Sequence, residues 1–166
     1  SPELEIIGLT TVFGNTDIEH CSLNGLRLVE IAGSEKTPVC KGAGRPMFLP
    51  DLELGTYVHG VDGMGNTNPP PPKGTLDPRS ADGFIIEMVK RHPGEITLAP
   101  LGPMTNIALA LQRAPEIAGM VKEVVLMGGN AYVPGNISPA AEANIYHDPH
   151  AAEIVFRGEN LSTPAG

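Results

Sequence analysis

Runs of consecutive apolar residues alternate along the chain with segments in which apolar residues recur at helical spacing. Residues 4–12, 96–100 and 122–127 are rich in apolar and β-branched residues, and residues 38–40 form a shorter apolar stretch. Such runs are typical of strands that are buried on both faces of a sheet. We therefore predict strands at the three long runs and a further short strand at 38–40.

Helical spacing predicts four helices, near residues 17–32, 84–92, 103–113 and 149–157. The ends of two of them carry residues that favour helix boundaries. Asp17 is a suitable N-cap, and Gly33 is suited to the position just after the helix. Asp148 can cap the last helix, because Pro149 follows it at the first helical position.

Strands and helices follow one another in turn, which predicts an α/β fold with a doubly wound, mostly parallel sheet and helices on both faces. We expect residues 1–166 to form a single domain, and an incomplete one, because only three residues precede the first predicted strand. Ligands of such sheets bind beyond the carboxyl ends of the strands. The segments at 14–15, 101–102 and 128–144 should therefore carry the chemistry.

Residues 42–78 break the alternation. This segment holds seven glycines and four consecutive prolines at 69–72. A long loop within a compact domain is usually functional or disordered, and a proline run on its own is a stiff spacer. We expect residues 46–78 to be mobile in the absence of a ligand, because they offer little apolar surface for anchoring.

Charge and composition limit the kinds of binding partner that we expect for this chain. The net charge is −8, and no cluster of lysine or arginine is present, so we expect no nucleic-acid partner. No apolar run approaches the roughly 20 residues of a membrane span, and no signal peptide is visible, so we expect no membrane association. Cys21 and Cys40 lack the spacing of a zinc site, which favours two reduced thiols and a cytoplasmic location.

Polar side chains gather after two of the predicted strands. Asn15 follows the first strand, and Asn136, Ser138, Glu142 and Asn144 follow the last one. On extended backbone Glu142 and Asn144 would point to the same side. A carboxylate flanked by carboxamides suits a neutral polyol, since it accepts hydroxyl protons while the amides both donate and accept. A solvated polar loop is the alternative for these residues, and a turn residue is the alternative for Asn15.

The sequence HGVDGMGN at 59–66 is rich in glycine, but it matches neither a dinucleotide fingerprint nor a P-loop. His59 could contact a ligand or donate a proton, or it could be an exposed surface histidine. We interpret His147 and Asp148 as mainly structural.

Four motifs in this order resemble the inosine-uridine preferring nucleoside hydrolases. They are LTTVFGN at 9–15, HGVDGMG at 59–65, LGPMTNIA at 101–108, and MGG, GN and AEANIYHDP between 127 and 149. The resemblance covers essentially the whole chain. It implies a doubly wound nucleoside hydrolase fold and hydrolysis of ribonucleosides to free base and ribose.

The resemblance also implies roles for individual positions. His59 corresponds to a histidine near the base and ribose, and Met127 to a methionine that lines the sugar pocket. Leu101 corresponds to a residue whose backbone carbonyl binds Ca²⁺, a cation that prefers oxygen ligands. The residues that match those holding the ribose hydroxyls are Asn15, Asn136, Glu142 and Asn144.

The family's aspartate-rich first motif, which binds calcium and activates water, has no counterpart in this sequence. A later His-Asp pair of the family has none either. We therefore expect no catalytic residue in this chain apart from His59 as a possible proton donor, and we expect the chain by itself to be inactive. For the intact protein the resemblance implies Ca²⁺ as cofactor, a nucleoside as substrate and a homo-oligomer.

Two other functions use some of the same features. A non-catalytic nucleoside- or sugar-binding module would need only the polar side chains. A dinucleotide-binding domain would need a glycine fingerprint after the first strand, which residues 14–16 do not supply. The sequence does not distinguish a purine from a pyrimidine preference.

Overall fold

A computed structural model describes residues 3–50 and 54–158. The chain divides into two compact units, each of which is described by itself. The first unit comprises residues 1–44 and 53–81, and the second comprises residues 45–52 and 82–166. The expectation of one domain over residues 1–166 stays a prediction. No helix among the described residues is both long enough and apolar enough to cross a membrane.

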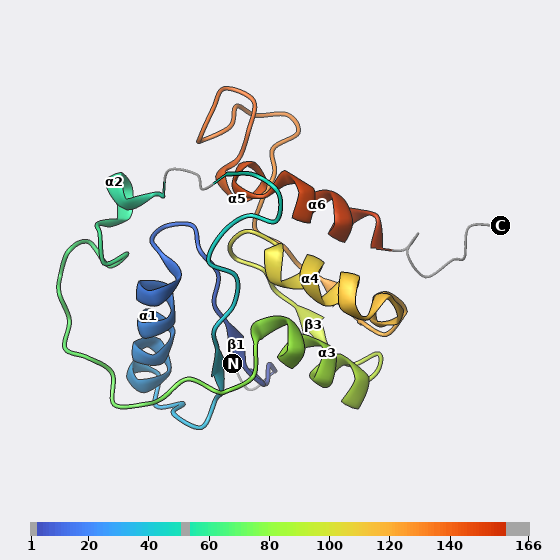
Figure 1. The fold of residues 1–166 in the computed structure, drawn as a ribbon, viewed down its shortest axis with the longest axis horizontal. Helices are drawn as coiled ribbons and strands as arrows, with labels where there is room; N and C mark the ends of the chain where they lie inside the picture. Colours follow the sequence, from blue (N-terminus) through green and yellow to red (C-terminus); the bar gives the residue numbers. More distant parts are fainter. Residues whose placement is uncertain (1–2, 51–53, 159–166) are drawn as a thin grey trace. The chain divides into compact units, whose positions relative to one another are not determined.

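The first unit contains a pair of parallel strands with a helix between them (Figure 1). Strand β1, Leu9–Thr10, pairs with β2, Val39–Cys40, and α1, Ile18–Ile31, connects the two. A short helix α2, Thr56–His59, lies in the long segment that follows. The core of this unit consists of Leu26 and Val29 from α1 packed against Val39.

The capping residues predicted for α1 are confirmed. The Asp17 carboxylate accepts the backbone N–H of His20 at 2.9 Å. After the helix, Gly33 takes a positive φ of 65°, and the N–H of Ser34 returns to the carbonyl of Val29 at 2.8 Å. Glycine adopts this conformation at little cost, which explains why the helix ends there.

The second unit also contains a pair of parallel strands, β3, Thr97–Leu98, and β4, Glu123–Val124. Hydrogen bonds from Lys122 to Ile96 and from Met127 to Pro100 extend this ladder over the predicted strand ranges. The helices of the unit are α3, Ala81–Arg91, whose first residue belongs to the first unit, α4, Thr105–Arg113, the 3₁₀ helix η1, Pro115–Gly119, α5, Ala143–His147, and α6, Pro149–Phe156.

Two clusters of buried side chains form the core of the second unit. One joins α3, α4 and η1 through Val89, Leu111 and Ile117. The other joins α4 to α6 through Ala108 and Ala152. The small residues allow the two helices to approach closely, and α6 is further fixed by its predicted cap Asp148.

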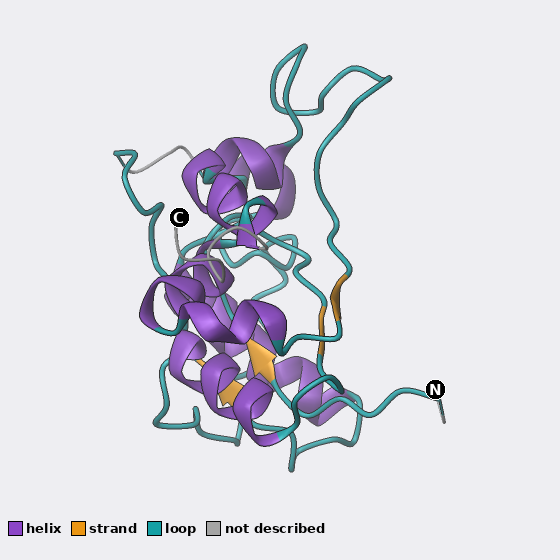
Figure 2. Cartoon of the chain, turned by 90° about the vertical axis from the view of Figure 1, so that its right-hand side faces the viewer, coloured by secondary structure: helices purple, strands orange, loops and turns teal. Residues whose placement is uncertain are grey.

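The parallel α/β architecture is confirmed, and Figure 2 shows how short the strands are beside the loops and helices. Burial of the strands on both faces is wrong as a general statement. Strand β2 is buried, but Leu4, Ile6 and Val125 are 75%, 66% and 55% exposed. Within the described part of the chain nothing covers these side chains.

The long segment after β2 is less irregular than predicted. It contains α2, and His59 is the last residue of that helix rather than part of an open loop. Residues 51–53 of this segment lie outside the described residues. Its mobility without a ligand stays a prediction.

Candidate functional site

In the second unit, one amide side chain connects the ends of both strands. Asn144 lies in the first turn of α5, and its Nδ2 donates to the Met127 carbonyl at 2.8 Å and to the Leu101 carbonyl at 3.3 Å. Leu101 follows β3 and Met127 follows β4. Because the strands are parallel, their carboxyl ends lie at one edge, where the sequence placed the candidate residues.

Glu142 is the N-cap of α5. One carboxylate oxygen accepts the N–H of Asn144 at 3.0 Å, and the other accepts those of Ile145 and Gly129 at 3.3 and 3.0 Å. Glu142 and Asn144 do not share the extended backbone on which both side chains would point to the same side, because only Glu142 is extended and Asn144 is helical. A short helix needs acceptors for its first N–H groups, and the glutamate supplies them.

Asn136 is attached to the same helix start. Its Oδ1 accepts the N–H of Ala143 at 2.8 Å, and its own N–H donates to the Ala141 carbonyl at 3.1 Å. The structure therefore brings together five of the residues predicted for the site, namely Leu101, Met127, Asn136, Glu142 and Asn144. The Leu101 and Met127 side chains are 71% and 55% exposed.

The other two predicted residues, Asn15 and His59, lie in the first unit on either side of Gly55. A Cβ at Gly55 would lie 3.4 Å from the Asn15 Cα and 3.4 Å from the His59 Cδ2. The N–H of Gly55 also donates to the Gly14 carbonyl at 3.0 Å. The start of α2 is thus fixed directly against the segment after β1.

Sequence reasoning missed three residues around His59. Thr16 donates through Oγ1 to the Val61 carbonyl at 2.6 Å, and Asn24 donates to the Asp62 carbonyl at 2.8 Å. The buried Asp62 carboxylate accepts three backbone N–H groups of its own loop. An aspartate between glycines is a signal for such a turn, but only the folded chain shows that Thr16 and Asn24 bind the same loop.

The structural interpretation of Asp148 is confirmed. Its side chain is fully buried, and Oδ1 accepts the N–H of Ala151 at 3.0 Å at the start of α6. Oδ2 accepts the Thr105 hydroxyl at 2.7 Å and the N–H of Met47 at 3.1 Å. Asp148 thereby joins α4, α6 and the backbone at Met47.

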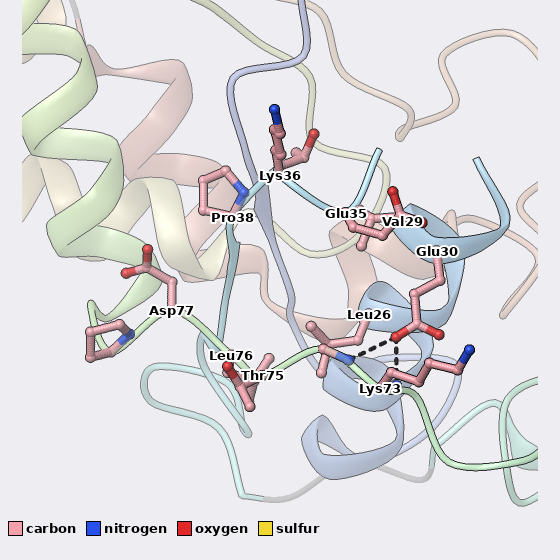
Figure 3. A pocket seen from close by; sticks show the side chains of 13 residues that line it. Leu26, Val29, Glu30, Glu35, Lys36, Pro38, Lys73, Thr75, Leu76 and Asp77 are labelled. Atoms are coloured by element: carbon pink, nitrogen blue, oxygen red, sulfur yellow. Dashed lines mark hydrogen bonds between the residues drawn. The ribbon is translucent and has the colours of Figure 1, made fainter. Parts of the chain in front are cut away.

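A solvent-open cavity of ≈ 760 Å³ lies elsewhere in the first unit, between α1 and residues 73–78 (Figure 3). None of the predicted site residues lines it. Glu30 lies at its wall, where Oε1 accepts the N–H groups of Lys73 and Gly74 at 2.6 and 2.8 Å. This carboxylate is engaged by the chain itself, so we place the candidate site at the strand ends and not in this cavity.

The sequence matches the family described as "Inosine-uridine preferring nucleoside hydrolase" over residues 1–164. The chain belongs to this family. Solved nucleoside hydrolase structures have the fold found here over about half of their own length. Membership does not by itself assign a role to any single residue.

Two plant relatives and one solved structure illustrate the similarity to other nucleoside hydrolases. The probable uridine nucleosidase 2 of Arabidopsis thaliana is 49% identical over 158 residues, which are 94% of this chain and 49% of that protein. Uridine nucleosidase 1 of the same plant is 46% identical over 156 residues, 94% of this chain and 46% of that protein. The purine-preferring ribonucleoside hydrolase from Gardnerella vaginalis matches with a TM-score of 0.91 at 38% identity, over 95% of this chain and 51% of that one.

The chain spans about half the length of the curated nucleoside hydrolases that it matches. Calcium, the cofactor implied by the family resemblance, needs several oxygen ligands. Among the described residues no group of three or more histidine, cysteine, aspartate or glutamate side chains could hold a metal ion. The Leu101 carbonyl, already contacted by Asn144, does not make a calcium site by itself.

Proposed function

We propose that the whole protein hydrolyses the N-glycosidic bond of ribonucleosides, releasing the free base and ribose. The observation that supports this most directly is the arrangement at the strand ends of the second unit. Glu142, Asn136 and Asn144 lie around one helix start, beside the carbonyls of Leu101 and Met127.

The Glu142 carboxylate retains capacity for a ligand. An ionised carboxylate has about four acceptor positions, and three are used by the N–H groups of Gly129, Asn144 and Ile145. The remaining one suits a ribose hydroxyl. These three hydrogen bonds hold the Glu142 carboxylate in a single orientation. Little conformational entropy of the side chain is therefore lost when the sugar binds.

Cleavage of the glycosidic bond develops positive charge on the ribose ring. A carboxylate that holds a hydroxyl of that ring stabilises this charge more than it stabilises the neutral substrate, which lowers the barrier. If the whole protein binds Ca²⁺, the Leu101 carbonyl would be one of its oxygen ligands, and the ion would supply activation of the attacking water. We assign ribose binding and orientation to the described residues, with His59 beside Asn15 as a group able to donate a proton.

The substrate class is the ribonucleosides as a whole. The relatives described above include both uridine nucleosidases and a purine-preferring enzyme. The residues gathered at the strand ends suit the sugar, which all these substrates share. We therefore leave the preferred base to experiment and propose that recognition depends first on the ribose hydroxyls.

The test is release of base from uridine and from inosine by the full-length protein, with and without a calcium chelator. We expect turnover that chelation abolishes and added Ca²⁺ restores. The 166-residue chain alone should release no base. A non-catalytic binding module is the second candidate, because the polar side chains at the strand ends suit a sugar, while the described residues contain no group of three or more histidine, cysteine, aspartate or glutamate side chains that could hold a metal ion. Saturable nucleoside binding by the full-length protein without base release would establish that candidate and contradict the proposed activity.

A further inference from the structure

The loop that follows His59 is folded around a single carboxylate. Asp62 is 8% exposed, and its Oδ1 accepts the N–H groups of Met64 and Asn66, both at 2.8 Å. Its Oδ2 accepts the N–H of Asn68 at 3.0 Å. One carboxylate thus binds three backbone N–H groups spread over five residues. Among the residues that the structure describes, none of this loop belongs to an apolar cluster that could fix its conformation instead.

The same loop forms hydrogen bonds with the backbone at and just after His59. The N–H of Gly65 donates to the His59 carbonyl at 2.7 Å, and the Asn66 side chain accepts the N–H of Val61 at 2.7 Å. Both contacts require residues 64–66 to fold back over the end of α2. The Asp62 carboxylate holds these residues in that position through the N–H groups of Met64 and Asn66.

Two contacts attach the same loop to the rest of the first unit. Thr16, which is 1% exposed, donates to the Val61 carbonyl, and Asn24 of α1 donates to the Asp62 carbonyl. Thr16 directly follows Asn15. The loop that follows His59 is therefore hydrogen-bonded both to the residue next to Asn15 and to α1.

Glycine makes this path possible. Gly60 has a φ of 79°, and a Cβ there would lie 2.6 Å from the Asn66 backbone nitrogen. A Cβ at Gly63, with a φ of 69°, would lie 2.7 Å from the Thr16 Cγ2. The glycines permit the chain to turn, but they do not favour one turn over another. The hydrogen bonds of Asp62 therefore select one conformation of the loop.

We propose that Asp62 is the positioning residue for His59, holding the end of α2 so that the imidazole stays beside Asn15. Its action is indirect, because its carboxylate is used by backbone N–H groups. The bond from the N–H of Met64 contributes most to keeping the pKa of Asp62 below its ordinary value, so the carboxylate is ionised at neutral pH. That His59 contributes to turnover rests on the proposed function, whereas the positioning of His59 by Asp62 does not.

The experiment compares Asp62→Ala and Asp62→Asn with a matched control, Glu30→Gln, in the full-length protein. Glu30 also accepts two backbone N–H groups, from Lys73 and Gly74, but at the far end of the same segment. Each substitution is made with His59 present and with His59→Ala. We expect Asp62→Ala to lower kcat/KM for uridine by about tenfold or more, and Asp62→Asn to lower it less, because one acceptor oxygen remains.

The double variants decide whether Asp62 acts through His59. With His59→Ala already present, Asp62→Ala should lower kcat/KM by no more than about twofold further. Glu30→Gln should change it by no more than about twofold in either background. Fully additive losses for Asp62→Ala and His59→Ala, or a loss for Glu30→Gln as large as that for Asp62→Ala, would overturn the proposal.

A second readout does not depend on turnover. The imidazole NMR signals of His59 report its surroundings directly, and they should shift or broaden in Asp62→Asn and stay in place in Glu30→Gln. Unchanged His59 signals in folded Asp62→Asn would overturn the positioning role. If the wild-type protein released no base, the proposed function would fail, while the His59 signals would still decide for or against Asp62.

Discussion

The two units present their candidate residues in different ways. In the second unit Glu142 and Asn144 belong to the start of a helix, and Ile145 of the same helix packs on the cluster that joins α4 to α6. In the first unit His59 ends a four-residue helix with no buried residue. Its surroundings are fixed by polar contacts to the backbone, chiefly those of Asp62.

This difference predicts different responses to substitution. Where a candidate residue is also a helix cap on an apolar core, its removal should lower the free energy of unfolding as well as ligand binding. Where the candidate residue is held by a polar loop, loss of a supporting contact should alter position while the stability of the unit changes little. The four predictions below test this contrast, beginning with the largest expected effect.

Asp148→Ala should destabilise the second unit most. It removes the acceptor for the Ala151 N–H, the Thr105 hydroxyl and the Met47 N–H, in a position without solvent access. We expect a loss of about 3 kcal/mol or more in the free energy of unfolding. The matched change in the first unit is Asp17→Ala, a half-exposed cap that should cost about 1 kcal/mol. Equal losses in urea unfolding of the two full-length variants would contradict the contrast.

Glu142→Ala should reduce both turnover and stability. Loss of a charged acceptor for a ribose hydroxyl corresponds to about 1.5–3 kcal/mol, or roughly ten- to a hundredfold in kcat/KM. Loss of the α5 cap should lower the free energy of unfolding by about 1 kcal/mol. Affinity for the free base should not fall comparably, because it has no ribose. Glu153→Ala, an exposed change on α6, is the control. Hydrolysis by Glu142→Ala at an unchanged rate would show that the role assigned to this residue is wrong.

Acid should weaken the first unit through Asp77. Hydrogen bonds from the Arg79 side chain lower the pKa of Asp77 from 3.8 to about 2. Since the folded-state pKa is the lower one, its stabilising effect is complete above pH 3.8 and disappears as the pH falls through about 2. The denaturant midpoint of the wild type should therefore fall more steeply between pH 5 and pH 2 than that of Asp77→Asn. Parallel pH profiles would exclude this contribution.

Hydrogen exchange should show the smallest difference, within the long segment after β2, most of which belongs to the first unit. We expect amides in residues 46–78 to exchange faster than those of the strands in the absence of a ligand. Within the segment, the amides of Met64, Asn66 and Asn68 should exchange more slowly than their neighbours, since Asp62 accepts all three. Protection throughout the segment as strong as in the strands would contradict its expected mobility.

Local sequence was sufficient for the four longer α-helices, α1, α3, α4 and α6, and for the order of the main elements. Asp17 and Gly33 mark the ends of α1 because a capping carboxylate and a residue tolerant of positive φ act within a few positions of the chain. The sequence also predicted that the strands at β3 and β4 run parallel, because an apolar run, a helix and a second apolar run leave few alternative connections. The helices α2 and α5 escaped prediction, since four or five residues carry too little periodicity.

For the candidate site, the sequence by itself determined which residue types follow each strand, and so which side chains could meet at one edge in the second unit. Only the tertiary structure decided what those side chains do there. Asn144 reaches the carbonyl of Leu101, 43 residues away in the chain, because two parallel strands end side by side. The Glu142 carboxylate accepts the N–H of Gly129, 13 residues earlier, across the loop that follows β4. Asp62 gathers its own loop, but its place beside α1 depends on Asn24, 38 residues earlier. Hydrogen bonds of this range have no local sequence pattern, because their partners become neighbours only when the strands pair and the helices pack.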